Sequence, residues 1–159
     1  MKRLALSLAA LAIAATAHAQ VTVKDPWVRA TVPQQKATGA FMQLTAAQDS
    51  RLMAASSPVA GVVEIHEMFM DNNVMKMREV TGGLVLPSGK TIELKPGGYH
   101  VMLMDLKGQV KDGELVPMRL VFEGKDGKKQ TVDVKAAARP MNTAAKADPG
   151  QVGHAGMKH

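Results

Sequence analysis

The sequence contains no cysteine among its 159 residues. This absence excludes a scaffold held together by disulfide bonds, and it excludes metal ligation by thiolates. Any metal bound by this chain must therefore be held by histidine, methionine, aspartate or glutamate side chains. An electron-transfer site of the blue-copper type is disfavoured for the same reason, because that site needs a cysteine thiolate beside two histidines.

Aromatic side chains are scarce, with one Trp, one Tyr and three Phe. The formal net charge of the chain is +6, but its basic residues are scattered among acidic ones in segments typical of turns. Proteins that bind nucleic acid usually show a basic patch, often with aromatic side chains for base stacking. The sequence offers no such stripe, so we expect no nucleic-acid partner. It also shows no Ser-His-Asp arrangement or carboxylate pair, so we expect no enzymatic activity.

Long apolar runs are absent as well. The longest, Leu4 to Ala15, follows two basic residues and is shorter than the roughly 20 residues that span a bilayer. Ala17 and Ala19 place small side chains at the −3 and −1 positions of a cleavage site. This layout predicts that residues 1–19 are a secretory signal peptide. We expect a soluble mature chain from residue 20 onward, exported to the periplasm and not spanning a membrane, with a formal charge of +4.

The remainder of the chain consists of short segments rich in Val, Thr, Ile and Met, separated by Gly, Pro, Asn and Asp. None keeps a helical period over ten residues. The expected strands are Val21 to Val32, Ala40 to Ala46, Val62 to Met70, Val74 to Val80, Thr91 to Leu94, Tyr99 to Leu106, Leu115 to Glu123 and Gln130 to Ala136. Many short strands at this spacing predict an all-β domain over residues 20–138, built as an antiparallel sandwich or barrel.

From residue 139 to residue 159 the composition changes to Ala, Lys, Asp, Gly and Pro. We expect a flexible C-terminal tail there. The tail ends in three side chains able to bind metal: His154, Met157 and His159. Both readings of this segment, a second metal site and a disordered end, stay open at this point.

Methionine is unusually frequent, with twelve in a chain that has almost no aromatic residues. In VEIHEMFMDNNVMKMREV, alternate side chains of a strand share one face. If the Asn-Asn dipeptide is a two-residue hairpin loop, Met70 faces Met75 and Met68 faces Met77, with His66 diagonal to Met77. One face of one hairpin would thus hold one imidazole and four thioethers.

A second cluster follows in GGYHVMLMDL, where His100, Met102 and Met104 share a face and Val101 and Leu103 occupy the other. The two His-x-Met groups could meet across the predicted sandwich or at its rim. Thioether sulfur is a soft, uncharged ligand that suits Cu(I), and imidazole accepts Cu(I), Cu(II) or Zn(II). Together the two clusters indicate a metal site and favour copper.

Packing is the alternative explanation for methionine on a strand, because its flexible side chain fills gaps in cores. We prefer packing for Met42, Met53, Met118 and Met141. Two His-x-Met groups in register on strand faces are harder to explain in this way, since histidine is an unusual residue for an apolar stripe.

The spacing of these residues resembles that of the periplasmic PCu(A)C-type copper chaperones, a family of cupredoxin-like fold. The family pattern is a histidine, about ten residues, a methionine, about 21 residues, and then His-x-Met. Here ten residues separate His66 from Met77, and 22 separate Met77 from the His-Val-Met triplet at 100–102. WVRATVPQQKATGAFMQL, LKPGGYHVMLMDLK and VPMRLVFEGKDG resemble further family segments. The likeness covers most of the mature chain, from Pro26 to Val134.

The resemblance implies that one copper ion, as Cu(I), is held by His66, Met77, His100 and Met102. Met68 stands close by as a candidate accessory ligand, and the tail residues 154, 157 and 159 would be accessory ligands for a second copper, Cu(II). We expect an exposed site at one end of the sandwich, with an affinity that falls below about pH 6.5 because imidazole must be neutral to bind.

The resemblance also implies a role in assembling the copper sites of cytochrome c oxidase. The partner would be the copper-binding subunit of the oxidase or a Sco-type assembly protein. The alternative is a periplasmic sequestering protein that buffers copper and confers resistance. Both roles require the same site. A deletion strain separates them, because loss of oxidase activity at low copper indicates delivery and copper sensitivity with normal respiration indicates buffering.

Overall fold

The computed structural model describes residues 20–140, and all of its regular elements are strands. The expected signal peptide and most of the expected tail, including His154, Met157 and His159, lie outside the described residues. The strands are β1 (Val21–Arg29), β2 (Ala37–Ala46), β3 (Ser50–Ser56), β4 (Ala60–Asp71), β5 (Val74–Glu79), β6 (Leu84–Leu86), β7 (Thr91–Leu94), β8 (Tyr99–Leu106), β9 (Leu115–Gly124) and β10 (Lys129–Arg139). The all-β prediction is confirmed.

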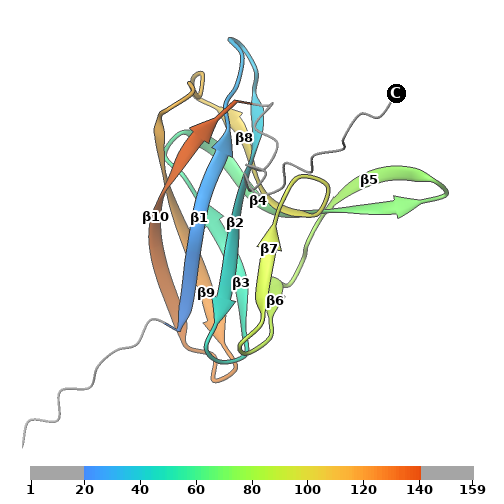
Figure 1. The fold of residues 1–159 in the computed structure, drawn as a ribbon, viewed down its shortest axis with the longest axis vertical. Coiled ribbons are helices and arrows are strands. Elements are labelled where there is room, and N and C mark those ends of the chain that lie inside the picture. Colours follow the sequence, from blue (N-terminus) through green and yellow to red (C-terminus); the bar gives the residue numbers. More distant parts are fainter. Residues whose placement is uncertain (1–19, 141–159) are drawn as a thin grey trace, which may run out of the picture.

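Hydrogen bonding joins the strands in the order β5-β4-β8-β2-β1-β10-β9-β3-β6, with β7 added beside β2. The path curls so that β3 contacts β4 and β6 contacts β2, which gives a two-layered sandwich that is not closed into a barrel. β5 and the far end of β4 extend away from the rest of the strands as an arm (Figure 1). Within residues 20–140, no helix is present that could cross a membrane.

The eight expected strands all correspond to observed strands, and two observed strands were missed. β3 has the sequence SRLMAAS, which lacks β-branched residues, and β6 is only three residues long. β3 pairs with β9 on one side and with β6 on the other, and both strands form because of this pairing. The sheet is not wholly antiparallel, since β1 runs parallel to β10 over Trp27 to Arg29. β10 includes Arg139, one residue beyond the expected domain boundary.

Pro26 lies inside β1, at an irregularity where the register with β2 shifts between Lys24 and Trp27. Asp25 there has a φ of 49°, and its carboxylate accepts two hydrogen bonds from the Arg139 guanidinium. Proline is tolerated within a sheet at such bulges because its missing N–H removes no regular ladder bond. The bulge thus resolves the conflict between a proline and a strand pattern.

The core lies between the two layers and is aliphatic. Its largest fully buried side chains come from every layer of the sandwich: Phe122, Met42, Leu44, Leu52, Leu86, Leu94, Leu103, Met118 and Leu120. The packing interpretation of Met42 and Met118 is confirmed by this burial. Met53 is also packed, against Gly83, but it is 37 % exposed and so lies at the surface instead of in the core. Met141 lies outside the described residues.

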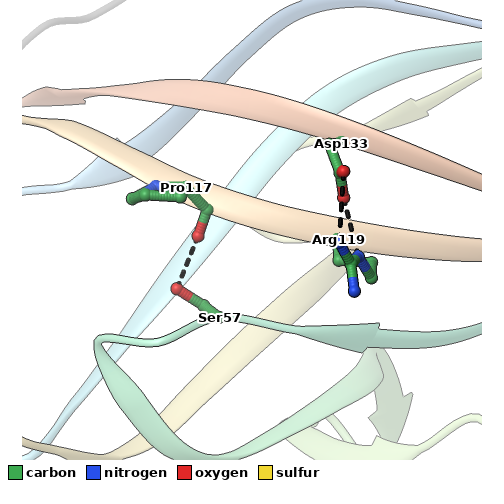
Figure 2. A network of polar contacts seen from close by, with 4 residues as sticks. All are labelled: Ser57, Pro117, Arg119 and Asp133. Atoms are coloured by element: carbon green, nitrogen blue, oxygen red, sulfur yellow. Dashed lines mark hydrogen bonds and ion pairs between the residues drawn. The ribbon is translucent and has the colours of Figure 1, made fainter.

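Polar contacts hold the outer corner of the sandwich, where the turn between β3 and β4 lies against β9 (Figure 2). The Ser57 hydroxyl donates to the Pro117 carbonyl at 2.7 Å, and the Arg119 guanidinium donates to both carboxylate oxygens of Asp133 at 2.8 and 3.3 Å. These residues line an open pocket of about 630 Å³. No histidine lines it, so it is unrelated to the metal-binding clusters predicted from the sequence.

The burial of the methionines predicts how each contributes to stability. Met42→Ala should lower the free energy of unfolding by about 2–5 kcal/mol, because it leaves a cavity in a closely packed core. Met53→Ala should lower it by clearly less, because this side chain lies at the surface, is 37 % exposed, and leaves no closed cavity when it is removed. Denaturant unfolding of both variants measures the difference. Equal losses would contradict the placement of the two residues.

Candidate metal centre

The register of three neighbouring strands brings the two predicted clusters together. β4 pairs with β8 so that His66 lies directly opposite His100 and Glu64 opposite Met102. β4 pairs on its other side with β5. Met68 there faces Met77, so the hairpin register expected from the Asn-Asn loop is confirmed. Because directly opposite residues share a face, the two His-x-Met groups occupy one continuous surface.

This surface is the outer face of the sheet, away from the core. Val101 and Leu103 alternate with the ligand candidates of β8 and point into the core, where they are 0 % exposed. His66 and His100 are nevertheless only 8 % and 7 % exposed, while Met77 is 46 % exposed. The expectation of an exposed site is therefore wrong for the imidazoles, which are covered by neighbouring side chains and loops. Met77 is the most exposed of the four predicted ligands, and Met102 is half-buried.

The surroundings of His100 fix its tautomer. Its Nδ1 lies 3.2 Å from the Gly98 carbonyl oxygen, which can only accept, so Nδ1 carries the hydrogen and donates. In the neutral ring Nε2 then holds a lone pair, and this atom lies 3.2 Å from the Sδ atom of Met77. A nitrogen lone pair and a soft thioether sulfur thus converge, which is the donor set that a soft cation requires.

Burial lowers the pKa of His100 below its ordinary value of 6.5, and the nearby His66 and Arg29 lower it further. The hydrogen bond to Gly98 acts in the opposite direction. The net effect favours the neutral imidazole, the form that ligates metals. His100 is thereby kept ready to act as a ligand at a pH where an exposed histidine would begin to protonate.

His66 is fixed in the complementary way. Its Nε2 lies 2.7 Å from the Glu64 carboxylate, which accepts the hydrogen bond, so the Nδ1 atom holds the lone pair of the neutral ring. That Nδ1 is buried and has no hydrogen-bond partner within residues 20–140. Buried polar atoms are nearly always paired, so an orphaned imidazole nitrogen indicates a ligand site. A carboxylate on the opposite ring nitrogen is the usual second partner of a metal-bound histidine.

An aromatic floor lies beside His100. The ring centroid of Phe41 lies 6.3 Å from that of His100 and 4.5 Å from that of Trp27. The Cζ atom of Arg29 lies 5.6 Å from the same Phe41 centroid. Gly39 permits this arrangement, because a Cβ there would lie 2.9 Å from the Phe41 ring. Sequence reasoning missed these residues and Glu64. Glu64 could have been found, since it precedes His66 by two positions and so shares its face.

An open pocket of about 390 Å³ gives access to this group. Among its lining side chains are Met68, Met77, His100 and Met102. His66 is not among them and lies behind, its ring centroid 5.8 Å from that of His100. The structure thus places all four predicted ligands and the accessory Met68 in one neighbourhood.

Other candidates are set apart. Met104 shares the face of β8 but does not line the pocket. Within the part of the chain that the structure describes, no three His, Cys, Asp or Glu side chains cluster as a metal site would require. The potential metal donors that line the pocket are the imidazole of His100 and methionine sulfur. The tail candidates at 154, 157 and 159 are outside the described residues, so their contribution stays a prediction.

Comparison with known proteins gives one family and several relatives. The family described as “Putative lipoprotein LpqE-like” matches residues 21–136. The protein “Putative lipoprotein Lxx21020” of Leifsonia xyli is 32 % identical over 114 residues, covering 72 % of this chain and 68 % of that protein. The family model and this relative therefore match the same domain.

Among solved structures, the solution structure of CuI-DR1885 from Deinococcus radiodurans is 33 % identical, with a TM-score of 0.57. It covers 79 % of this chain and 83 % of that one. The apo PCuAC domain from PmoF1 is 24 % identical with a TM-score of 0.58, and covers 76 % of this chain and 96 % of that one. At that identity the second likeness shows the fold alone.

The lowered pKa of His100 predicts a pH dependence of stability. The unfolded chain binds a proton near pH 6.5 that the folded chain binds only at lower pH. The free energy of unfolding should therefore be fully maintained above pH 6.5 and fall as pH decreases through the folded pKa. Denaturant unfolding between about pH 7.5 and about pH 5 should show a shallower fall for His100→Gln than for the wild type. Parallel curves would contradict the lowered pKa.

Proposed function

Because this chain belongs to the LpqE-like family, we propose that it is an exported copper chaperone that carries one Cu(I) ion. His66, Met77, His100 and Met102 would hold the ion, with Met68 as an accessory ligand. Residues 1–19 would direct the chain to the periplasm and be removed there. The tail would add a second, weaker copper site, taking Cu(II) through its two histidines.

The observation that carries the proposal is the pair of fixed tautomers. Each imidazole has one nitrogen beside an acceptor, Glu64 or the Gly98 carbonyl, so that in the neutral ring the other nitrogen carries the lone pair. The free nitrogens are His66 Nδ1, which is buried and unpartnered, and His100 Nε2, which lies against a thioether. Burying such groups without a partner is costly, and a bound cation would repay that cost.

The ligand chemistry supports a carrier rather than a catalyst. Two imidazoles and two thioethers bind Cu(I) without the oxidisable thiolates of a cysteine site. Met77 is the exposed member of the set, so a partner can approach the ion from its side. Transfer would proceed by stepwise ligand exchange, in which partner thiolates replace thioethers. The recipient we propose is the copper-binding subunit of cytochrome c oxidase or a Sco-type assembly protein.

The first test is Cu(I) binding under anaerobic conditions in competition with a chelator of known affinity. The wild type should take up one tight equivalent, and the variant His100→Ala with Met102→Ala should lose it. Met104→Leu is the matched control, because this methionine lies on the same strand and face but outside the pocket. Loss of binding in the control, or retention in the double variant, would refute the assignment.

The second test concerns Glu64, which we propose orients His66 and does not ligate. Glu64→Leu should weaken Cu(I) binding by about 10- to 100-fold, as removal of partners of metal-bound histidines usually does. Glu64→Gln should retain most of the affinity, because its amide oxygen can still accept the Nε2 hydrogen. Tighter binding by Glu64→Leu would instead mean that the carboxylate competes with copper for His66.

A further inference from the structure

The outer end of the β4–β5 hairpin carries two methionines that the proposed site does not use. Met70 and Met75 lie directly opposite each other across the strands. They are 62 % and 47 % exposed. Core packing, which accounts for the fully buried Met42 and Met118, cannot account for them. Side chains of directly opposite residues begin about 4.5–5.5 Å apart at Cβ, close enough for two thioethers to share one ion.

These two residues continue the row of the proposed site. Met68 and Met77 form the adjacent cross-strand pair on the same face of the hairpin, and both line the pocket beside His100. We call this surface, formed by Met68, Met70, Met75 and Met77, the methionine face. It runs from the exposed end of the arm to the buried imidazoles with no interruption by another residue type.

The opposite face of the hairpin carries both of its basic side chains, while the acidic Glu79 lies on the side of the methionines, opposite His66. Arg78 donates to Glu67 at 2.7 Å and lies 4.4 Å over the Phe69 ring, and Lys76 pairs with Asp71. These contacts all occur on the side away from the methionines, because the residues alternate with them along both strands. The methionine face therefore has no lysine or arginine of the hairpin on it, and no cationic side chain there would repel an incoming cation.

The turn holds the two methionines in register. Asn72 and Asn73 have φ values of 48° and 63°, and positive φ at both central residues defines the type I′ turn, which fixes two-residue hairpins. A slip by one residue would move the methionines to opposite faces. The turn and the ion pairs on the opposite face together keep Met70 and Met75 facing each other, although both side chains are exposed.

We propose that Met70 and Met75 form an outer Cu(I) site, distinct from the inner site, where the ion first binds before it passes inward. This inference rests on the proposed function and adds an entry step to it. In that step, Cu–S bonds to Met70 and Met75 break as Cu–S bonds to Met68 and Met77 form. The ion stays Cu(I), and no proton is released, because thioethers are neutral and carry no hydrogen on sulfur. With fewer ligands and greater exposure, the outer site binds more weakly than the inner one.

The test is an anaerobic Cu(I) titration of the protein with 13C-labelled methionine methyl groups, followed by NMR. The first equivalent should shift the methyl signals of Met77 and Met102, and further Cu(I) should shift those of Met70 and Met75. Met53 is the internal control, since it is exposed but has no methionine opposite it. Its signal should stay in place.

Matched variants make the test decisive. Met70→Leu with Met75→Leu preserves the shape of the hairpin and should abolish the weaker uptake, slow the loading of the inner site, and leave its equilibrium affinity unchanged. Met53→Leu should alter none of these. A variant with His154, Met157 and His159 all replaced by Ala should keep the outer uptake, because that uptake does not use the tail.

The proposal is overturned if the methyl signals of Met70 and Met75 do not shift at a lower Cu(I) concentration than the signal of Met53. It is equally overturned if weaker uptake survives in the Met70→Leu, Met75→Leu variant, or if that variant loads the inner site as fast as the wild type. Failure of the inner site would look different. In that case Met77 and Met102 would stay unshifted while the outer pair still responded, and the outer site would stand without the chaperone function.

Discussion

The register between β4 and β8 is the constraint on which the proposed site depends. It sets His66 opposite His100, and the adjoining β4–β5 hairpin, fixed by its Asn-Asn turn, sets Met68 opposite Met77. Side chains alternate strictly along a strand, so a slip of one residue would turn one imidazole into the core. The register is secured by that core, because Val101 and Leu103 are fully buried on the other face of β8. Apolar packing on one face of β8 thus fixes the position of the histidine on its other face.

The histidines are unusual for an outer face because they are buried there. Phe41 packs beside His100, and burial of this imidazole is the largest cause of its lowered pKa. The same burial leaves the Nδ1 atom of His66 without a partner. Three other buried side-chain atoms among residues 20–140 also lack a partner, on Arg29, Ser50 and Gln130, but only the His66 nitrogen lies beside a second imidazole. Unpaired buried polar groups of this kind are often found where function is concentrated.

The methionines illustrate why residue type alone does not assign a role. Met42 and Met118 fill the core, Met77 opens the proposed site to solvent, and Met70 stands exposed at the end of an arm. All share the same soft, flexible side chain. What separates them is the face of the strand on which each lies and whether a second layer covers that face. The arm of β4 and β5 extends away from the other strands (Figure 1), and Met70 and Met75 on it are exposed.

The sequence by itself determined the all-β class, the hairpin register at the Asn-Asn loop and the likeness to the PCu(A)C-type family, which the family match confirms. These follow from local signals: a period of two, turn residues, and the spacing between histidine and methionine. Only the tertiary structure decided that β1 runs parallel to β10, that the imidazoles are buried, and that Glu64 and Phe41 support them. Each of these depends on contacts between strands distant in the chain, and no periodicity within one strand encodes which neighbour it will meet.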